Sequence, residues 1–259
     1  MQVMSLFIAS LNSGSNGNCY YIGSEREAVL IDAGISCRET EKRMSRLGLR
    51  LENVKAIFIS HEHSDHIRGL PVLSRKYRLP VYITDGTLVH GRLSDQLLSV
   101  QSFRAFETVT IGELDVLAFP KAHDAADPHS FMITRNGIRI GVFTDIGVTC
   151  DELVNHFRQC HAAFLEANYD EEMLANSRYP YFLKRRISGG KGHLSNKQAL
   201  ELFTTHRADY MSHLLLSHLS QENNCPQLVQ DLFAGCAGRT TVTVASRYQE
   251  SAVYHITGL

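Results

Sequence analysis

The sequence predicts an α+β protein in which two mixed β-sheets are sandwiched between outer helices, an αββα arrangement. Short runs of β-branched and aromatic residues alternate with amphipathic segments along the chain. Several of the strand-like runs follow one another without an intervening helix, which favours hairpins over a doubly wound parallel sheet. No repeat, linker or low-complexity tract divides the sequence, so we expect one domain over residues 1–259.

The elements follow from these runs in chain order. The apolar runs that predict strands are bounded by Gly, Asn and other turn residues, and they cover residues 3–9, 19–23, 28–34, 54–60, 81–84, 101–106, 109–119, 130–135, 138–144, 161–167, 214–217, 240–245 and 252–257. The segments with apolar residues at helical spacing cover residues 36–47, 67–77, 86–98, 149–158, 170–187, 195–206 and 226–234. Gly48 is expected to end the first helix, and Asn136–Gly137 indicates a hairpin.

The composition is that of an ordinary folded protein. Of the 259 residues, 44% are apolar and 20% are charged, and the six cysteines form no C-x-x-C pair, so reduced thiols are expected. No run reaches the roughly 18 apolar residues of a membrane span, and the first residues lack a basic signal region. We therefore expect a cytoplasmic protein without membrane contact. The net charge of −1 means that any contact with nucleic acid must be local.

A dense histidine cluster is the strongest chemical signal. The chain has 13 histidines, and the segment His61-Glu62-His63-Ser64-Asp65-His66 contains three of them. This is not an H-E-x-x-H helix motif, because Asp65 stands four residues after His61. In an irregular turn, His61 and His63 can reach one metal while Asp65 and His66 reach a second. The spacing predicts two metal ions, with a polar surface turn as the alternative.

The segments around this cluster resemble a known family. AVLIDAG followed by FISHEHSDHIRG resembles the metallo-β-lactamase fold, in which this motif supplies ligands to a dinuclear site between two β-sheets. A longer series resembles the YycJ/WalJ-type subfamily of bacterial exonuclease-like proteins: SGSNGNCYYIG, LIDAGISCRE, HEHSDHIRGL, FPKAHDAADP, FTDIG, FLEANYD, GGKGHLSNKQA and LLLSHLSQENN. The resemblance extends over nearly the whole chain.

The resemblance implies the remaining metal ligands. His123 matches the third histidine of the first ion, Asp145 the bridging carboxylate, and His218 the distal histidine of the second ion. From the sequence alone, His129 is an alternative to His123, His213 is an alternative to His218, and Asp145 could belong to an ordinary turn. The implied ligand sets share Asp145 and are otherwise His61, His63 and His123 for one ion and Asp65, His66 and His218 for the other.

Three further residues receive roles from the resemblance. Asp32 matches an aspartate that binds no metal but orients the histidine turn, a role whose loss typically costs 10–100-fold in metal affinity or activity. Glu166, His193 and then His218 follow the order found in β-CASP nucleases and ribonuclease J relatives. The interval between Asp145 and His193 is too short for the inserted clamp domain of those nucleases, so long-RNA binding in their manner is not expected.

A basic stretch lies just before His193. Residues 178–197 contain six Lys or Arg and no acid, with aromatic residues interleaved. Such a stretch suits a nucleic-acid strand, although a solvated helix face is an equally simple explanation. The candidate substrate-binding residues are Lys184, Arg185, Arg186, Lys191 and Ser195. The loop at 13–18 is expected to form a tight turn near the metal cleft.

These features together predict a metal-dependent phosphodiesterase. Two divalent ions, Zn²⁺ by preference with Mn²⁺ or Fe²⁺ as alternatives, would activate a bridging hydroxide as nucleophile. Asp65 would orient that hydroxide, and His193 would neutralise the phosphoryl oxygens and protonate the leaving oxygen. The resemblance implies 5′-to-3′ exonuclease activity on DNA, with single strands favoured, and a link to DNA repair.

Two other functions fit the same residues. A glyoxalase II-like hydrolase would direct the same nucleophile at the carbonyl carbon of a thioester or lactone. A binding module stabilised by metal would perform no turnover, but it would need a site closed by protein ligands. Nothing in the sequence indicates an oligomeric state.

Overall fold

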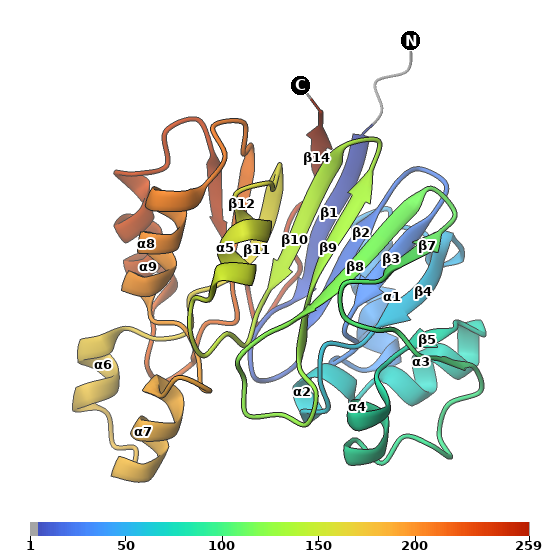
Figure 1. Ribbon diagram of the computed structural model, residues 1–259, viewed down its shortest axis with the longest axis horizontal. Helices are drawn as coiled ribbons and strands as arrows, with labels where there is room; N and C mark the ends of the chain where they lie inside the picture. The colour runs from blue at the N-terminus through green and yellow to red at the C-terminus, as the bar shows by residue number, and fades with distance from the viewer. Residues whose placement is uncertain (1–4, 259) are drawn as a thin grey trace.

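Two β-sheets lie face to face in this computed structural model, which describes residues 5–258 (Figure 1). The first sheet has the order β14-β1-β2-β3-β4-β5-β6, with β1 (Ser5–Asn12), β2 (Cys19–Gly23), β3 (Ala28–Ile31), β4 (Val54–Phe58), β5 (Val81–Tyr82), β6 (Val100–Gln101) and β14 (Tyr254–Thr257). The second has the order β13-β12-β11-β10-β9-β8-β7, with β7 (Thr108–Ile111), β8 (Leu114–Pro120), β9 (His129–Arg135), β10 (Ile138–Phe143), β11 (Ala162–Glu166), β12 (His213–Ser217) and β13 (Thr241–Val244).

Both sheets are mixed. In the first sheet, β14, β1, β2 and β3 pair antiparallel, whereas β3, β4, β5 and β6 pair parallel. In the second, β7 to β10 pair antiparallel and β10 to β13 pair parallel. The hairpin between β9 and β10 turns at Asn136 and Gly137, both with positive φ, as expected for this pair of turn residues.

Helices cover the outer faces of both sheets (Figure 1). Their bounds are α1 (Cys37–Arg46), the 3₁₀ turn η1 (Leu51–Asn53), α2 (Ser64–Ile67), α3 (Leu70–Tyr77), α4 (Asp85–His90), α5 (Asp151–Phe157), α6 (Glu171–Asn176), α7 (Tyr181–Ser188), α8 (Asn196–His206) and α9 (Pro226–Ala234). Helices α1 and α3 pack on the first sheet, and α5, α8 and α9 pack on the second. The predicted αββα fold is therefore confirmed. Within residues 5–258, each helix is too short or too polar to cross a bilayer.

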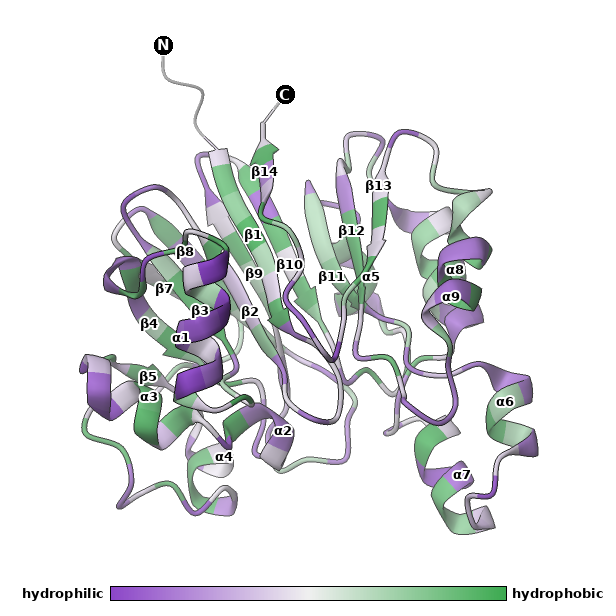
Figure 2. Cartoon of the chain, turned by 180° about the vertical axis from the view of Figure 1, so that it is seen from behind, coloured by the Kyte–Doolittle hydropathy of each residue, from purple (hydrophilic) through white to green (hydrophobic). Residues whose placement is uncertain are grey.

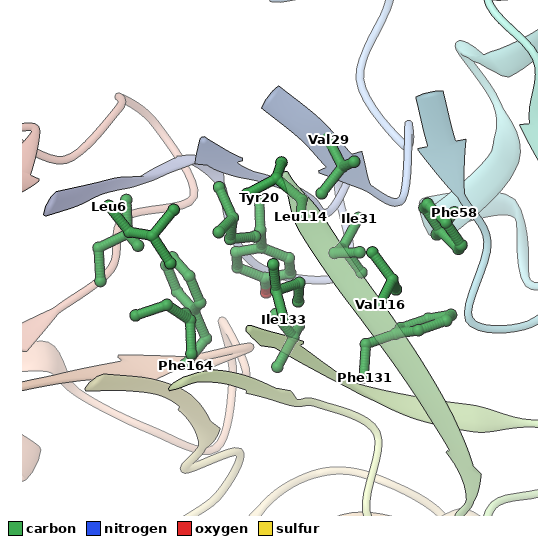
Figure 3. Close-up of a cluster of buried hydrophobic side chains, with 14 of the residues drawn as sticks. Leu6, Tyr20, Val29, Ile31, Phe58, Leu114, Val116, Phe131, Ile133 and Phe164 are labelled. Atoms are coloured by element: carbon green, nitrogen blue, oxygen red, sulfur yellow. The ribbon is translucent and has the colours of Figure 1, made fainter. Parts of the chain in front are cut away.

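The sheets are held together by a core between them, part of which is drawn in Figure 3. Side chains alternate along each strand, so Leu6 of β1 and Phe164 of β11 face this inner core. Leu11 of β1 and Leu165 of β11 point to the opposite faces of their sheets and pack under the outer helices. Figure 2 shows hydrophobic residues concentrated in the strands and hydrophilic residues along α1. Because the strands are buried on both faces, polar functional side chains are expected at the strand ends.

Several predicted elements have different bounds in the structure. The strand expected at 109–119 is the hairpin β7–β8, which turns at Gly112 with φ of 59°. The helix expected at 170–187 divides into α6 and α7 because Pro180, which cannot continue a helical hydrogen-bond ladder, precedes α7. Helix α4 ends at His90, since Arg92 is left-handed.

Three further bounds differ. The strand expected at 101–106 is only the short β6, and the helix expected at 67–77 is α3, preceded by the separate turn α2. Residues 3 and 4 of the strand expected at 3–9 lie outside the described residues, and β1 runs on from Ser5 to Asn12.

Candidate metal centre and active site

The candidate site residues lie at one edge of the two sheets, the lower edge in Figure 1. Strands that run in the same direction end at the same edge, and in α/β sheets ligands bind outside such carboxyl ends. One residue follows or ends each of six strands: Asp32 after β3, His61 after β4, His123 after β8, Asp145 after β10, Glu166 at the end of β11, and His218 after β12. Sheet order thus collects residues that are far apart in the sequence.

The turn between β4 and α2 brings two histidines, His61 and His63, together with His123. His63 has an extended backbone just before the short helix α2, and this bend directs its ring toward His61. The Nε2 atom of His61 lies 3.0 Å from Nδ1 of His63, which lies 3.3 Å from Nε2 of His123. These nitrogens are close enough to one another to bind a single cation.

A second group lies beside the first. His218 Nε2 is 3.4 Å from Asp65 Oδ2, and His66 Nε2 is 3.5 Å from the same oxygen. Asp145 lies between the two groups: its Oδ2 is 3.2 Å from His66 Nε2, and its Oδ1 is 3.8 Å from His123 Nε2. The seven side chains named from the sequence as metal ligands therefore converge in two groups around Asp145.

The far ring nitrogens of these histidines are held by fixed hydrogen-bond partners. Ser60 Oγ lies 2.9 Å from His61 Nδ1, and the carbonyl oxygen of Gly192 lies 3.0 Å from His123 Nδ1. Metal-binding histidines ordinarily donate their second N–H to such a partner, which directs the other nitrogen's lone pair at the metal. The arrangement fits that pattern, with Nε2 of His61 and His123 facing inward.

One buried carboxylate oxygen has no hydrogen-bond partner. Asp145 Oδ2 is shielded from solvent and accepts no hydrogen bond from a described residue, although His66 Nε2 is near it. A buried carboxylate oxygen without a hydrogen-bond partner is costly unless a cation or a proton satisfies it. Together with histidine nitrogens and a second carboxylate, it provides a donor set that fits divalent metal ions.

Three site residues have left-handed backbones. Asp32, Asp145 and His218 have φ values of 62°, 56° and 56°, a region that residues other than Gly adopt rarely and at a cost of about 1–3 kcal/mol. Asp32 and His218 directly follow β3 and β12, and Asp145 lies two residues after the end of β10, so each left-handed step stands at the carboxyl end of a strand. Such conformations persist where the surrounding structure imposes them, and they concentrate at functional sites.

The Asp32 carboxylate accepts hydrogen bonds from the histidine turn and fixes its conformation. Its Oδ2 accepts hydrogen bonds from His66 Nδ1 at 2.7 Å and from Ser60 Oγ at 2.9 Å, and its Oδ1 accepts from the Ser60 backbone N–H at 2.8 Å. Burial alone would lower the pKa of His66, but Asp145 and Asp32 raise it well above its usual value. Asp32 therefore lies where an orienting residue is expected, with both carboxylate oxygens already occupied by Ser60 and His66.

Glu166 connects two histidines on the other side. Its Oε1 lies 2.8 Å from His193 Nδ1 and 2.9 Å from His218 Nδ1. Burial would raise the pKa of this carboxyl, but His193 and His218 bring it down to about 2. The ionised carboxylate accepts from both Nδ1–H groups, so the Nε2 atoms of both rings face the site. The side chain of His193 is 18% exposed, more than that of His218.

Two polar residues at the site were not singled out from the sequence. Asn18 directs Nδ2 at Asp65 Oδ2 and at His66 Nε2, both at 3.1 Å. The Lys121 ammonium is buried and donates to the carbonyl oxygen of Thr144, which precedes Asp145. The only sequence signals were an Asn at the end of the 13–18 loop and a Lys two residues before His123. That loop forms the tight turn expected beside the site.

The candidate substrate-binding residues fall on and after α7, which projects from the body beside α6 at the lower left of Figure 1. Arg185 and Lys191 are exposed. Arg186 pairs with Asp124 at 2.5 Å, and Lys184 donates to a backbone carbonyl. Ser195 has a different role from the expected one: it is fully buried and caps the N-terminus of α8, accepting from the Gln198 N–H.

The histidines that were alternatives lie elsewhere. His129 lies in β9, where its Nδ1 donates to the Asp127 carbonyl and its ring packs against Phe103. His213 begins β12 at the end of the strand opposite to His218 and packs against Tyr254. Neither belongs to a group of three or more potential metal ligands among residues 5–258.

The comparisons with known proteins agree with this fold. A family described as "Beta-lactamase superfamily domain" matches residues 27–218. The exodeoxyribonuclease YycJ of Bacillus anthracis is 36% identical over 233 residues, 88% of this chain and 87% of that protein. The exodeoxyribonuclease WalJ of Streptococcus pneumoniae is 33% identical, over 84% of this chain and 83% of its own length. The metallo-β-lactamase fold protein YhfI of Bacillus subtilis superposes with a TM-score of 0.75 at 15% identity, over 97% of this chain and all of that one.

A pair of mixed sheets with His and Asp side chains gathered at one edge is the framework of a metal-dependent hydrolase of the metallo-β-lactamase fold. The chain belongs to the β-lactamase superfamily, within the group that includes YycJ and WalJ. It is accordingly an enzyme of the hydrolase class.

Proposed function

We propose that this protein is an exonuclease that hydrolyses phosphodiester bonds in DNA, preferring single strands, with two divalent metal ions. The observation that carries this proposal is the His193–Glu166 pair, which stands beside both ligand groups with its histidine partly open to solvent. The relatives named exodeoxyribonucleases, which match over most of their length, support the same substrate class. Five histidines and two aspartates, without cysteine, suit Zn²⁺ and also Mn²⁺ or Fe²⁺.

The ligands would divide into two sets that share Asp145. The first ion would be held by His61, His63 and His123, and the second by Asp65, His66 and His218. Divalent ions bound there supply an activated water at neutral pH and neutralise negative charge on phosphoryl oxygens.

His193 would act on the leaving group. Glu166 fixes its Nδ1–H, so only Nε2 is free to contact substrate, and the carboxylate stabilises the ring when it is protonated. In that state Nε2–H donates to a phosphoryl oxygen and passes its proton to the departing oxygen. Asp65, whose side chain is partly exposed, accepts a hydrogen bond from the attacking water and aligns it with the phosphorus.

The basic side chains beside the site would hold the strand. Arg185 and Lys191 are exposed on the same segment that leads to His193, so a phosphate backbone lying on them would lead toward the catalytic group. Because the net charge of the whole chain is −1, this local patch, not a global field, would provide the attraction.

The test is degradation of 5′-labelled and 3′-labelled single-stranded DNA and RNA by metal-analysed protein, with an acyl-thioester assayed in parallel. We expect mononucleotides to be released from the DNA, starting at the 5′ end. Hydrolysis of the thioester without cleavage of any oligonucleotide would overturn the proposal in favour of a glyoxalase II-like activity. Products of internal cleavage would contradict exonuclease action.

A further inference from the structure

A cavity opens at the same edge of the sheets as the candidate metal centre, on the side of β13. It has a volume of about 330 Å³ and lies between the turn after β1, the segment after His218 and the residues after β13. Ser13 lines this cavity and also accepts a hydrogen bond from the His218 backbone N–H at 2.7 Å. Leu219, the residue next to His218, is part of its wall. The cavity therefore begins one residue from the candidate metal centre.

The cavity is lined by apolar side chains and by one positively charged side chain, that of Arg247. Leu219, Val244 and Ala245 supply apolar surface, and Arg247 is the only Lys or Arg among the described lining residues, none of which is acidic. The nearest acid along the chain, Glu250, is already paired with Arg46 at 2.6 Å. The positive charge of Arg247 is thus free of a carboxylate partner.

Arg247 has an unused donor group. Its Nη1 atom is buried and makes no hydrogen bond to a described residue, while its Nη2 makes only a long contact of 3.4 Å with Ser15 Oγ. A buried guanidinium nitrogen without a partner is costly, and phosphate is the group whose geometry it matches best. Tyr248 beside it is 71% exposed, and an exposed aromatic ring at a cavity rim suits stacking with a base.

We propose that this cavity is a subsite for one nucleotide, the terminal nucleotide of the substrate strand. Arg247 binds its phosphate and Tyr248 stacks on its base. The volume is at the lower end of the range for small-ligand sites, so it suits one nucleotide and not a longer segment. The inference rests on the proposed nuclease function and deepens it, because a cavity that fits a single nucleotide beside the cleavage site would favour removal of residues one at a time.

The experiment measures binding of deoxyadenosine 5′-monophosphate to the protein as purified, by calorimetric titration. Arg247→Met should weaken binding about tenfold or more, because a charge-assisted contact is lost. Tyr248→Ala should weaken it several-fold, and since that side chain is exposed, this variant should fold normally. Arg158→Met, at an exposed position at the end of α5, is the matched control and should bind like the unsubstituted protein. Deoxyadenosine and inorganic phosphate should each bind more weakly than the complete nucleotide.

A second readout separates this inference from the proposed function. Hydrolysis of bis(p-nitrophenyl) phosphate, which has no second phosphate for Arg247 to bind, should stay within about twofold in Arg247→Met, while KM for a single-stranded oligonucleotide rises in this variant. Equal affinity of the unsubstituted protein, Arg247→Met and Tyr248→Ala for the nucleotide would overturn the subsite. If the unsubstituted protein cleaves no phosphodiester but Arg247→Met still loses nucleotide binding, the proposed function fails and the subsite stands.

Discussion

His193 differs from the other histidines of the site in how it is held. Four of the five ligand histidines, His61, His66, His123 and His218, are buried, whereas His193 is fixed through Nδ1 by Glu166 and keeps part of its ring open. A histidine held in this way can transfer a proton to or from substrate, and the metal centre can still form without it. The distinction between holding metal and transferring protons is therefore testable at one residue.

Replacing His193 by Ala should slow cleavage of single-stranded DNA about 10²–10⁴-fold, because general acid–base catalysis contributes that much. The metal content should stay at the unsubstituted level, because the seven ligands remain. The measurement is kcat together with elemental analysis, and His90→Ala, on the exposed end of α4, is the matched control. Loss of metal with unchanged turnover would show that the roles are assigned wrongly.

Asp32→Asn should weaken metal binding about 10–100-fold, because the amide cannot hold His66 Nδ1–H as the carboxylate does. Asn tolerates the left-handed backbone of this position, so the turn itself should survive. Competition with a metal indicator dye measures the affinity, and the exposed Asp209→Asn serves as control. Unchanged affinity would mean that Ser60 alone orients the turn.

At the scale of elements, α7 is unusual in having no buried residue. Tyr181 and Phe182 are 76% and 73% exposed, and cations follow them on the same helix. A helix with so little packing derives little stability from the core and is held by its ends and by the Arg186–Asp124 pair. Basic and aromatic side chains beside His193 are expected of a surface that contacts a nucleic-acid strand, whose phosphates are charged and whose bases can stack on aromatic rings.

Reversing the charge of two exposed residues on this segment should weaken binding of DNA. In the double variant Arg185→Glu and Lys191→Glu, KM for a single-stranded oligonucleotide should rise, and the slope of log affinity against log salt should decrease by about 1.4, or about 0.7 for each lost phosphate contact. Hydrolysis of bis(p-nitrophenyl) phosphate should not change. The exposed pair Arg50→Glu and Lys55→Glu is the matched control. If the dependence of affinity on salt does not change in the double variant, Arg185 and Lys191 do not contact the DNA phosphates.

For the whole molecule, stability and metal binding are separable. The three hydrophobic clusters are built from strands and helices and do not include the candidate ligands. The fold should therefore persist without metal. The seven candidate ligands, five histidines and two aspartates, then lie close together with no cation among them.

Chelation should lower the melting temperature while leaving the circular dichroism of the folded state. Free metal at about 1,000 times its dissociation constant adds about 4 kcal/mol to the free energy of unfolding, so its removal should shift the transition clearly. Thermal melting with and without chelator, followed by metal re-addition, measures the effect, and Asp145→Asn should respond less. An identical melt in both conditions, with no metal found by elemental analysis, would refute the metal centre.

Much of the fold followed from local patterns. The strands and most helices were predictable because periodicity and turn residues act within a few positions, as in the hairpin at Asn136–Gly137. The hairpin at Gly112 and the break at Pro180 were missed, although both carry a local signal, because the apolar pattern continues across them. In such places periodicity by itself overestimates the length of an element.

The sequence by itself determined the αββα fold, the histidine turn at 61–66 and the basic run before His193, because each is a property of neighbouring residues. Only the tertiary structure decided that His123 and His218 join that turn while His129 and His213 do not. It also placed Glu166 between two histidines and set Arg247 beside the 13–18 loop. The reason is that sheet order and strand direction determine which strand ends meet, and these depend on contacts between residues far apart in the chain.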